Sequence, residues 1–195
     1  MSKFVPVCAA MLLSCAFAPL LPGAAVAQEG QDLMHIDCQN RFAVIFPSQH
    51  MTRDIMYTTH TGASVPAKQF YVERGADRYV VTVVNFPTGP VVDEAIVDHA
   101  ANDLRRRGEV RFSAAANYDP GYPGRQLNIF QPNGRQLRAS VYMADRHLTI
   151  TEADAAEGDF NALQFEQSIT LINGEGVDFD GNANGTPSRR FECRR

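Results

Sequence analysis

The segment from Arg78 to Phe86 constrains the fold more than any other part of this chain. It reads Arg-Tyr-Val-Val-Thr-Val-Val-Asn-Phe, so apolar and β-branched side chains occupy both alternating sets of positions. Successive side chains of a strand point to opposite faces of a sheet. This composition therefore predicts a central strand that is covered on both sides.

Seven further segments show the two-residue period or the flanking turn signals of antiparallel strands. They are residues 41–46, 55–60, 67–73, 109–116, 125–131, 136–144 and 147–152. Asn133-Gly134 predicts a tight hairpin, because both residues tolerate positive φ. Asp145-Arg146 is expected to turn the next pair of strands.

Two segments have helical spacing. The apolar stripe of the first consists of Val92, Ile96, Ala100 and Leu104. Pro90 suits its first position and Gly108 its end, and Asp159 is suited to cap a second helix from about Phe160 to Ser168. Strands in hairpins with two helices to cover them predict an α+β fold in a single domain, with an antiparallel sheet covered by helices in an α/β/α sandwich.

Residues 1–27 predict a secretory signal peptide. Lys3 precedes a long apolar stretch without an acid, and Ala25-Val26-Ala27 forms a small-x-small cleavage site. The mature protein is then expected in the periplasm or outside the cell, where cysteines oxidise. Leu12-Leu13-Ser14-Cys15 keeps a second interpretation open, in which a lipoprotein signal is cut before Cys15 and this cysteine is acylated.

Beyond the signal, we expect a polar lead-in at residues 28–37, the domain at 38–172 and a flexible tail at 173–195, which is rich in Gly, Asn, Asp and Pro. Only Cys38 and Cys193 remain after cleavage. An even number of cysteines in an oxidising compartment predicts a disulfide between them. The alternatives are two free thiols or a metal pair, although no histidines cluster near either cysteine.

Several motifs resemble PsbP-like domains. The strand that ends in Phe46-Pro47, the loop at 121–126, the hairpin at 138–148 and the closing segment at 165–171 match in order and spacing, across about residues 38–172. The chain departs from the pattern at Asp145 and Ile169, where the relatives have glycine and phenylalanine.

This resemblance implies an antiparallel sheet between helical layers. Members of that superfamily are mostly non-enzymatic, and they include an extrinsic subunit of the oxygen-evolving complex and a factor that binds the GTPase Ran. The bacterial members resembled here are uncharacterised exported proteins. What the resemblance implies for function is therefore a binding or accessory role.

Few residues of the chain suggest chemistry. The histidines are His35, His50, His60, His99 and His147, and none of them forms a His-Glu-x-x-His or His-x-His motif. His50 and His60 would attract a metal if they faced each other across a hairpin, but metal sites usually need three or four ligands, so surface histidines are the competing interpretation. Gly62-Ala63-Ser64 begins a nucleophile elbow without the glycine that should follow.

The tail contains one candidate calcium loop. Its oxygen ligands would be Asp178, Asp180, Asn182 and Asn184, which alternate along the sequence as in calcium loops. The glycine lies out of EF-hand register, and a flexible linker is the alternative. No other cofactor or metal is predicted.

The sequence thus predicts an exported, non-catalytic binding or accessory protein of the cell envelope, with an unidentified protein or envelope component as partner. The alternative is a small envelope hydrolase whose site assembles from loop residues. A formal net charge of −4 argues against nucleic acid as a partner. After signal removal, no segment is long and apolar enough to span a membrane.

Overall fold

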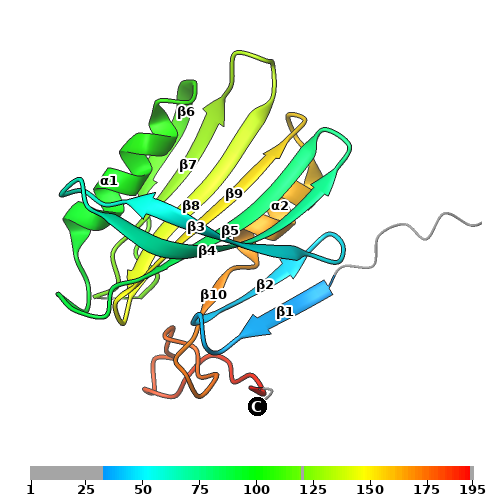
Figure 1. Ribbon diagram of the computed structural model, residues 1–195. Coiled ribbons are helices and arrows are strands. Elements are labelled where there is room, and N and C mark those ends of the chain that lie inside the picture. The colour runs from blue at the N-terminus through cyan, green and yellow to red at the C-terminus, as the bar shows by residue number, and fades with distance from the viewer. Residues whose placement is uncertain (1–32, 120, 194–195) are drawn as a thin grey trace, which may run out of the picture.

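The computed structural model describes residues 33–119 and 121–193. The expected signal peptide, its cleavage site and Cys15 lie outside the described residues. Seven strands form the main antiparallel sheet, in the order β3-β4-β5-β9-β8-β7-β6 (Figure 1). They are β3 (Met51–Thr58), β4 (Ser64–Arg74), β5 (Asp77–Asn85), β6 (Glu109–Ala115), β7 (Gly124–Phe130), β8 (Gln136–Ala144) and β9 (His147–Ala155).

Strand β5 occupies the interior of the sheet, between β4 and β9. Every side chain from Tyr79 to Val84 is buried. Tyr79, Val81 and Val83 belong to the core on one face, whereas Val84 belongs to the core on the other. The expectation of a strand covered on both sides is therefore confirmed. Full burial of such side chains contributes about 1.5–3 kcal/mol each.

The two helices lie on opposite faces of this sheet (Figure 1). Helix α1 (Glu94–Arg105) lies over β7, β8 and β9. Arg125 of β7 holds it there, because its guanidinium donates to Glu94 at 2.7 Å and contacts Asp98 at 2.8 Å. Helix α2 (Phe160–Gln167) lies over β8 and β9 on the other face.

A small antiparallel sheet completes the layer that contains α2. Its order is β1 (Leu33–Asp37), β2 (Phe42–Phe46) and β10 (Thr170–Leu171). Phe42, Phe46 and Phe165 are buried together between this layer and the main sheet. The predicted α+β fold, a sheet covered by helices in one domain, is confirmed.

The structure corrects two local expectations. Strand β1 lies in the second half of the polar lead-in expected at 28–37, because Leu33 to Asp37 pair in register with β2. The first helix does not begin at Pro90. Asp93 is its N-cap, with a side chain that accepts from the amide of Ala95 at 2.8 Å, and an N-cap carboxylate stabilises a helix start more directly than a proline.

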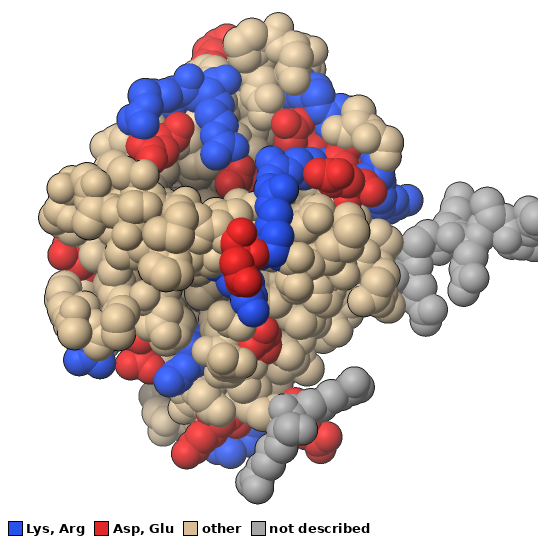
Figure 2. Space-filling view, viewed as in Figure 1, with Lys and Arg blue, Asp and Glu red and all other residues tan. Residues whose placement is uncertain are grey.

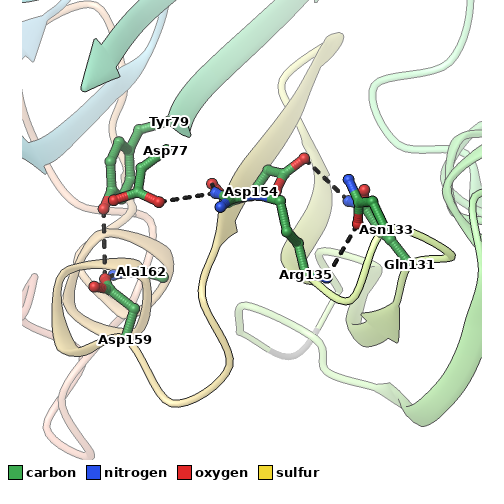
Figure 3. A network of polar contacts seen from close by, with 8 residues as sticks. All are labelled: Asp77, Tyr79, Gln131, Asn133, Arg135, Asp154, Asp159 and Ala162. Atoms are coloured by element: carbon green, nitrogen blue, oxygen red, sulfur yellow. Dashed lines mark hydrogen bonds and ion pairs between the residues drawn. The ribbon is translucent and has the colours of Figure 1, made fainter. Parts of the chain in front are cut away.

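A network around Arg135, in the turn between β7 and β8, joins this turn to the start of β5 and to the end of β9 (Figure 3). Its guanidinium donates to Asp154 at 2.6 Å and to Asp77 at 2.8 Å. Close by, Asp159 caps α2 through the amide of Ala162 at 2.8 Å and accepts from the hydroxyl of Tyr79 at 3.4 Å. The predicted cap of the second helix is thus present.

Residues 173–193, where the sequence predicts a flexible tail, follow a course of turns that folds back on itself. Isolated bridges join Ile172 to Asp178, Val177 to Arg190 and Gly181 to Pro187. Phe179 packs against Tyr122, with ring centroids 5.0 Å apart. These contacts explain why the segment has a defined position, while its flexibility stays a prediction.

No helix within residues 33–119 and 121–193 has the length and apolar character needed to cross a membrane.

Candidate functional site

The main candidate site is a groove between α1 and the strands β3 to β5, which we call the α1 groove. It exists because α1 covers only β7 to β9, so the other half of that sheet face is left open. Two hollows lie along it, one of 340 Å³ at the start of α1 and one of 200 Å³ at its end. Acidic and basic side chains are interspersed on the face that Figure 2 shows, with large uncharged areas between them.

The first hollow has mostly apolar walls. Its apolar lining residues are Ala63, Val65, Phe86, Pro90, Ile96 and Met143. Its polar lining residues come from two segments. Thr59 and Thr61, whose hydroxyls share a hydrogen bond of 2.9 Å, lie with His60 between β3 and β4. Thr88 and Asp93 lie between β5 and α1. Such a hollow suits an apolar side chain with a polar group next to it.

The second hollow has a polar floor whose groups bind one another. Gln69 of β4 accepts from the guanidinium of Arg53 at 2.8 Å and donates to the hydroxyl of Thr82 at 2.9 Å. Arg107 and Glu152 form an ion pair at its wall. Because these groups already have partners, the floor is a fixed surface that accepts a polar ligand without rearrangement.

Tyr57 of β3 lines the second hollow. Its hydroxyl is buried and has no hydrogen-bond partner among the described residues. Burial, and secondarily the nearby carboxylate of Asp103, raise the pKa of Tyr57 to about 12. The phenol therefore stays protonated at physiological pH, and it offers a donor to any ligand that lies in the groove.

His99 of α1 stands edge-on to Tyr57, with ring centroids 6.4 Å apart. Its Nε2 lies 3.2 Å from the carbonyl oxygen of Thr58 and 3.7 Å from the carboxylate of Asp103. No serine or cysteine is among the described residues that line either hollow. These contacts hold His99 between strand β3 and helix α1.

His60 and His99 were considered as isolated histidines in the sequence, and the groove beside which they lie was not predicted. Tyr57, Gln69 and Thr82 come from three strands, and Glu152 comes from a fourth. Their polarity on a face that is otherwise apolar was the available signal. The residues that meet them, however, depend on which strands α1 covers.

The structure does not bring His50 and His60 together, because the whole of β3 lies between them. His50 instead packs against His35, with ring centroids 4.2 Å apart, and stacks on Phe46 at 5.0 Å. Within residues 33–119 and 121–193 there is no group of three or more His, Cys, Asp or Glu side chains that could hold a metal ion.

Two of the four candidate calcium ligands, Asp178 and Asn184, use their side-chain oxygens within the protein. Asp178 is 6% exposed, and its carboxylate accepts from the hydroxyls of Tyr118 at 2.7 Å and Ser188 at 2.8 Å. Asn184 accepts from the amide of Thr186 at 3.0 Å. Asp180 and Asn182 line an open hollow next to them. Calcium binding here stays a prediction, and the bonds of Asp178 and Asn184 oppose it.

Cys38 and Cys193 form a disulfide, with Cα atoms 5.8 Å apart and a sequence separation of 155. This part of the sequence prediction is confirmed. The bond fastens the end of the described chain to the turn between β1 and β2. Such bonds are typical of proteins that fold in oxidising compartments.

No protein-family model and no curated protein matches this chain. Among solved structures, it is similar to cyanobacterial PsbP (CyanoP) from Synechocystis sp. PCC 6803, a solution structure. The match has 16% sequence identity and a TM-score of 0.45, and it covers 80% of this chain and 100% of that one.

Proposed function

We propose that this chain is an exported, non-catalytic binding protein of the cell envelope, and that its α1 groove binds an extended segment of a partner protein. The observation that carries the proposal is the buried hydroxyl of Tyr57, a residue that lines the second hollow; this hydroxyl has no hydrogen-bond partner among the described residues. A buried donor without a partner costs about 1–3 kcal/mol, and the carbonyl of a bound segment would remove this cost.

The two hollows fit the same kind of ligand. A segment that lies along α1 would place an apolar side chain among Val65, Phe86 and Ile96, and a polar one over Gln69 and Thr82. Specificity then comes from the spacing of the two hollows along α1. The leader motif and the disulfide between Cys38 and Cys193 support export.

Site-directed photo-crosslinking in cells tests the groove. Ala63 lines the first hollow and is exposed, whereas its neighbour Ser64 is exposed but does not line it. A photo-reactive phenylalanine analogue at position 63 is expected to give an adduct of defined mass, and the same analogue at position 64 is the matched control. Equal adducts from both positions, or none from position 63, would contradict the groove as the binding surface.

Once the adduct is identified, Tyr57→Phe tests the decisive hydroxyl. We expect affinity for that partner to fall by about three- to tenfold, because one buried hydrogen bond is lost while the ring stays in place.

Turnover by the purified protein in ester, peptide or glycan panels would instead support the hydrolase alternative. The intact mass of the exported protein is expected to equal that of a chain beginning at Gln28. A mass that corresponds to a chain beginning at a diacylated Cys15 would contradict this cleavage site.

A further inference from the structure

Another hollow, of 420 Å³, lies on the face of the main sheet opposite the α1 groove, and we call it the β6–β8 cleft. It is lined by Phe112, Gln126, Leu127, Asn128, Arg138, Glu166 and Gln167. It exists for the same reason as the α1 groove. Helix α2 covers β8 and β9, so β6 and β7 are left open on this face.

Three side chains of the cleft form a row across the sheet. Phe112 of β6 is paired with Asn128 of β7, and Asn128 is paired with Arg138 of β8. Side chains at directly paired positions are on the same face, with Cβ atoms about 5 Å apart. An aromatic ring, a carboxamide and a guanidinium therefore stand side by side, and the ring of Phe112 is 52% exposed.

Two polar atoms in this row are buried without a partner among the described residues. They are Oδ1 of Asn128, an acceptor, and Nε of Arg138, a donor. Buried polar atoms of native proteins nearly always have a partner. Oδ1 of Asn128 lacks a donor, and Nε of Arg138, on the neighbouring strand, lacks an acceptor. This indicates a ligand that supplies both a donor and an acceptor.

Glu166 of α2 closes the cleft. It is 4% exposed, and its carboxylate accepts from the hydroxyl of Ser140 and lies 3.4 Å from Nη2 of Arg138. The positive and negative charges of the cleft are therefore balanced. A phosphate would bring only acceptors, and it would leave Oδ1 of Asn128 unpaired beside the carboxylate. A cation would be repelled by the guanidinium of Arg138.

We propose that the β6–β8 cleft binds a neutral sugar unit. A hydroxyl is both a donor and an acceptor, so two adjacent hydroxyls of a pyranose satisfy Oδ1 of Asn128 and Nε of Arg138 together. The apolar C–H face of the ring then packs on Phe112. The volume of 420 Å³ is in the usual range for small-ligand sites and accommodates one sugar unit.

Titration of the mature chain, followed by ¹H–¹⁵N NMR, tests this proposal. The probes are glucose, galactose and N-acetylglucosamine, followed by their oligomers, which distinguish a free sugar from the end of a glycan. The expected result is a saturable shift of the side-chain resonances of Asn128 and Arg138. Acetamide serves as a further probe, and equal saturable shifts with acetamide would overturn the sugar assignment in favour of a simple amide.

Phe112→Ala and Asn128→Ala are each expected to weaken sugar binding by about tenfold, as expected for the loss of one aromatic packing surface or one buried hydrogen bond. Phe160→Ala is the matched control, because Phe160 is another exposed phenylalanine, 69% exposed, and it does not line the cleft. Affinity should be unchanged in this variant.

Thermal unfolding of each variant shows whether the fold is retained, and Phe112→Ala keeps the test valid if Asn128→Ala does not fold, because Phe112 is exposed. No saturable shift at Asn128 and Arg138 with any of the sugars would overturn the proposal. Shifts that persist undiminished in Phe112→Ala would overturn it as well.

Discussion

Two histidines in contact make the small sheet sensitive to pH. His35 and His50 pack together among Phe42, Phe46 and Phe70. Burial lowers the pKa of both, His50 lowers the pKa of His35 further, and the carboxylate of Asp37 opposes the shift in each. Both rings are therefore held neutral in the folded protein at a pH where free imidazoles bind protons.

We expect the free energy of unfolding to fall as the pH is lowered. The folded pKa values lie below 6.5, the usual value for histidine. The unfolded chain therefore binds more protons in this window, so stability is complete above pH 6.5 and is lost toward the folded pKa values. Urea unfolding between about pH 7.5 and about pH 5 measures the slope.

His50→Phe should reduce that slope, because an aromatic ring without a titratable group replaces one member of the pair. Met34→Leu is the control, since Met34 lies on the same small sheet and is 51% exposed. Its slope should equal that of the unmodified protein. An unchanged slope in His50→Phe would show that the pH dependence has another origin, such as His147, whose pKa is also lowered by burial.

At the scale of elements, the network around Arg135 holds hairpins together where no helix covers their ends. Arg135→Ala should lower the free energy of unfolding by about 1–2 kcal/mol, because the contacts to Asp77 and Asp154 are lost together. Arg78→Ala should cost less than about 0.5 kcal/mol, since Arg78 is more exposed and its contact to Glu73 is 3.9 Å long. Chemical denaturation of both variants measures the difference, and equal losses would show that the network adds nothing.

The sequence predicted most elements because their signals are local. The strands follow a two-residue period, and the turn at Asp145 and Arg146 has positive φ at both residues, 45° and 62°, as a tight hairpin requires. Strand β10 was not predicted, because Thr170-Leu171 continues the apolar spacing of α2 and becomes a strand only by pairing with β2. The α1 groove and the β6–β8 cleft were not predicted either, because each depends on which strands a helix leaves uncovered.

For the whole molecule, the disulfide between Cys38 and Cys193 is expected to be a large single contribution to stability. Closing a loop with 155 residues of separation restricts the unfolded chain, and the chain-entropy model gives about 4–5 kcal/mol. The double variant Cys38→Ala, Cys193→Ala should therefore melt well below the oxidised protein. Calorimetry with and without a reductant measures the effect, and the double variant should not respond to the reductant.

Amide hydrogen exchange of the same variant localises the effect. Residues 173–193 should lose protection first, because the bond fastens this segment to the turn after β1. Unchanged protection there, together with an unchanged melting temperature, would show that hydrogen bonds alone keep the segment in place.

The placement of these two cysteines also sets an order of events during biosynthesis. Cys38 leaves the ribosome well before Cys193, so the two thiols can meet only when the polypeptide between them has been made. No other sulfhydryl between them competes for pairing. Oxidation therefore joins the two ends of a domain only after the residues between them have been synthesised, and a chain truncated before Cys193 would keep a free thiol at Cys38.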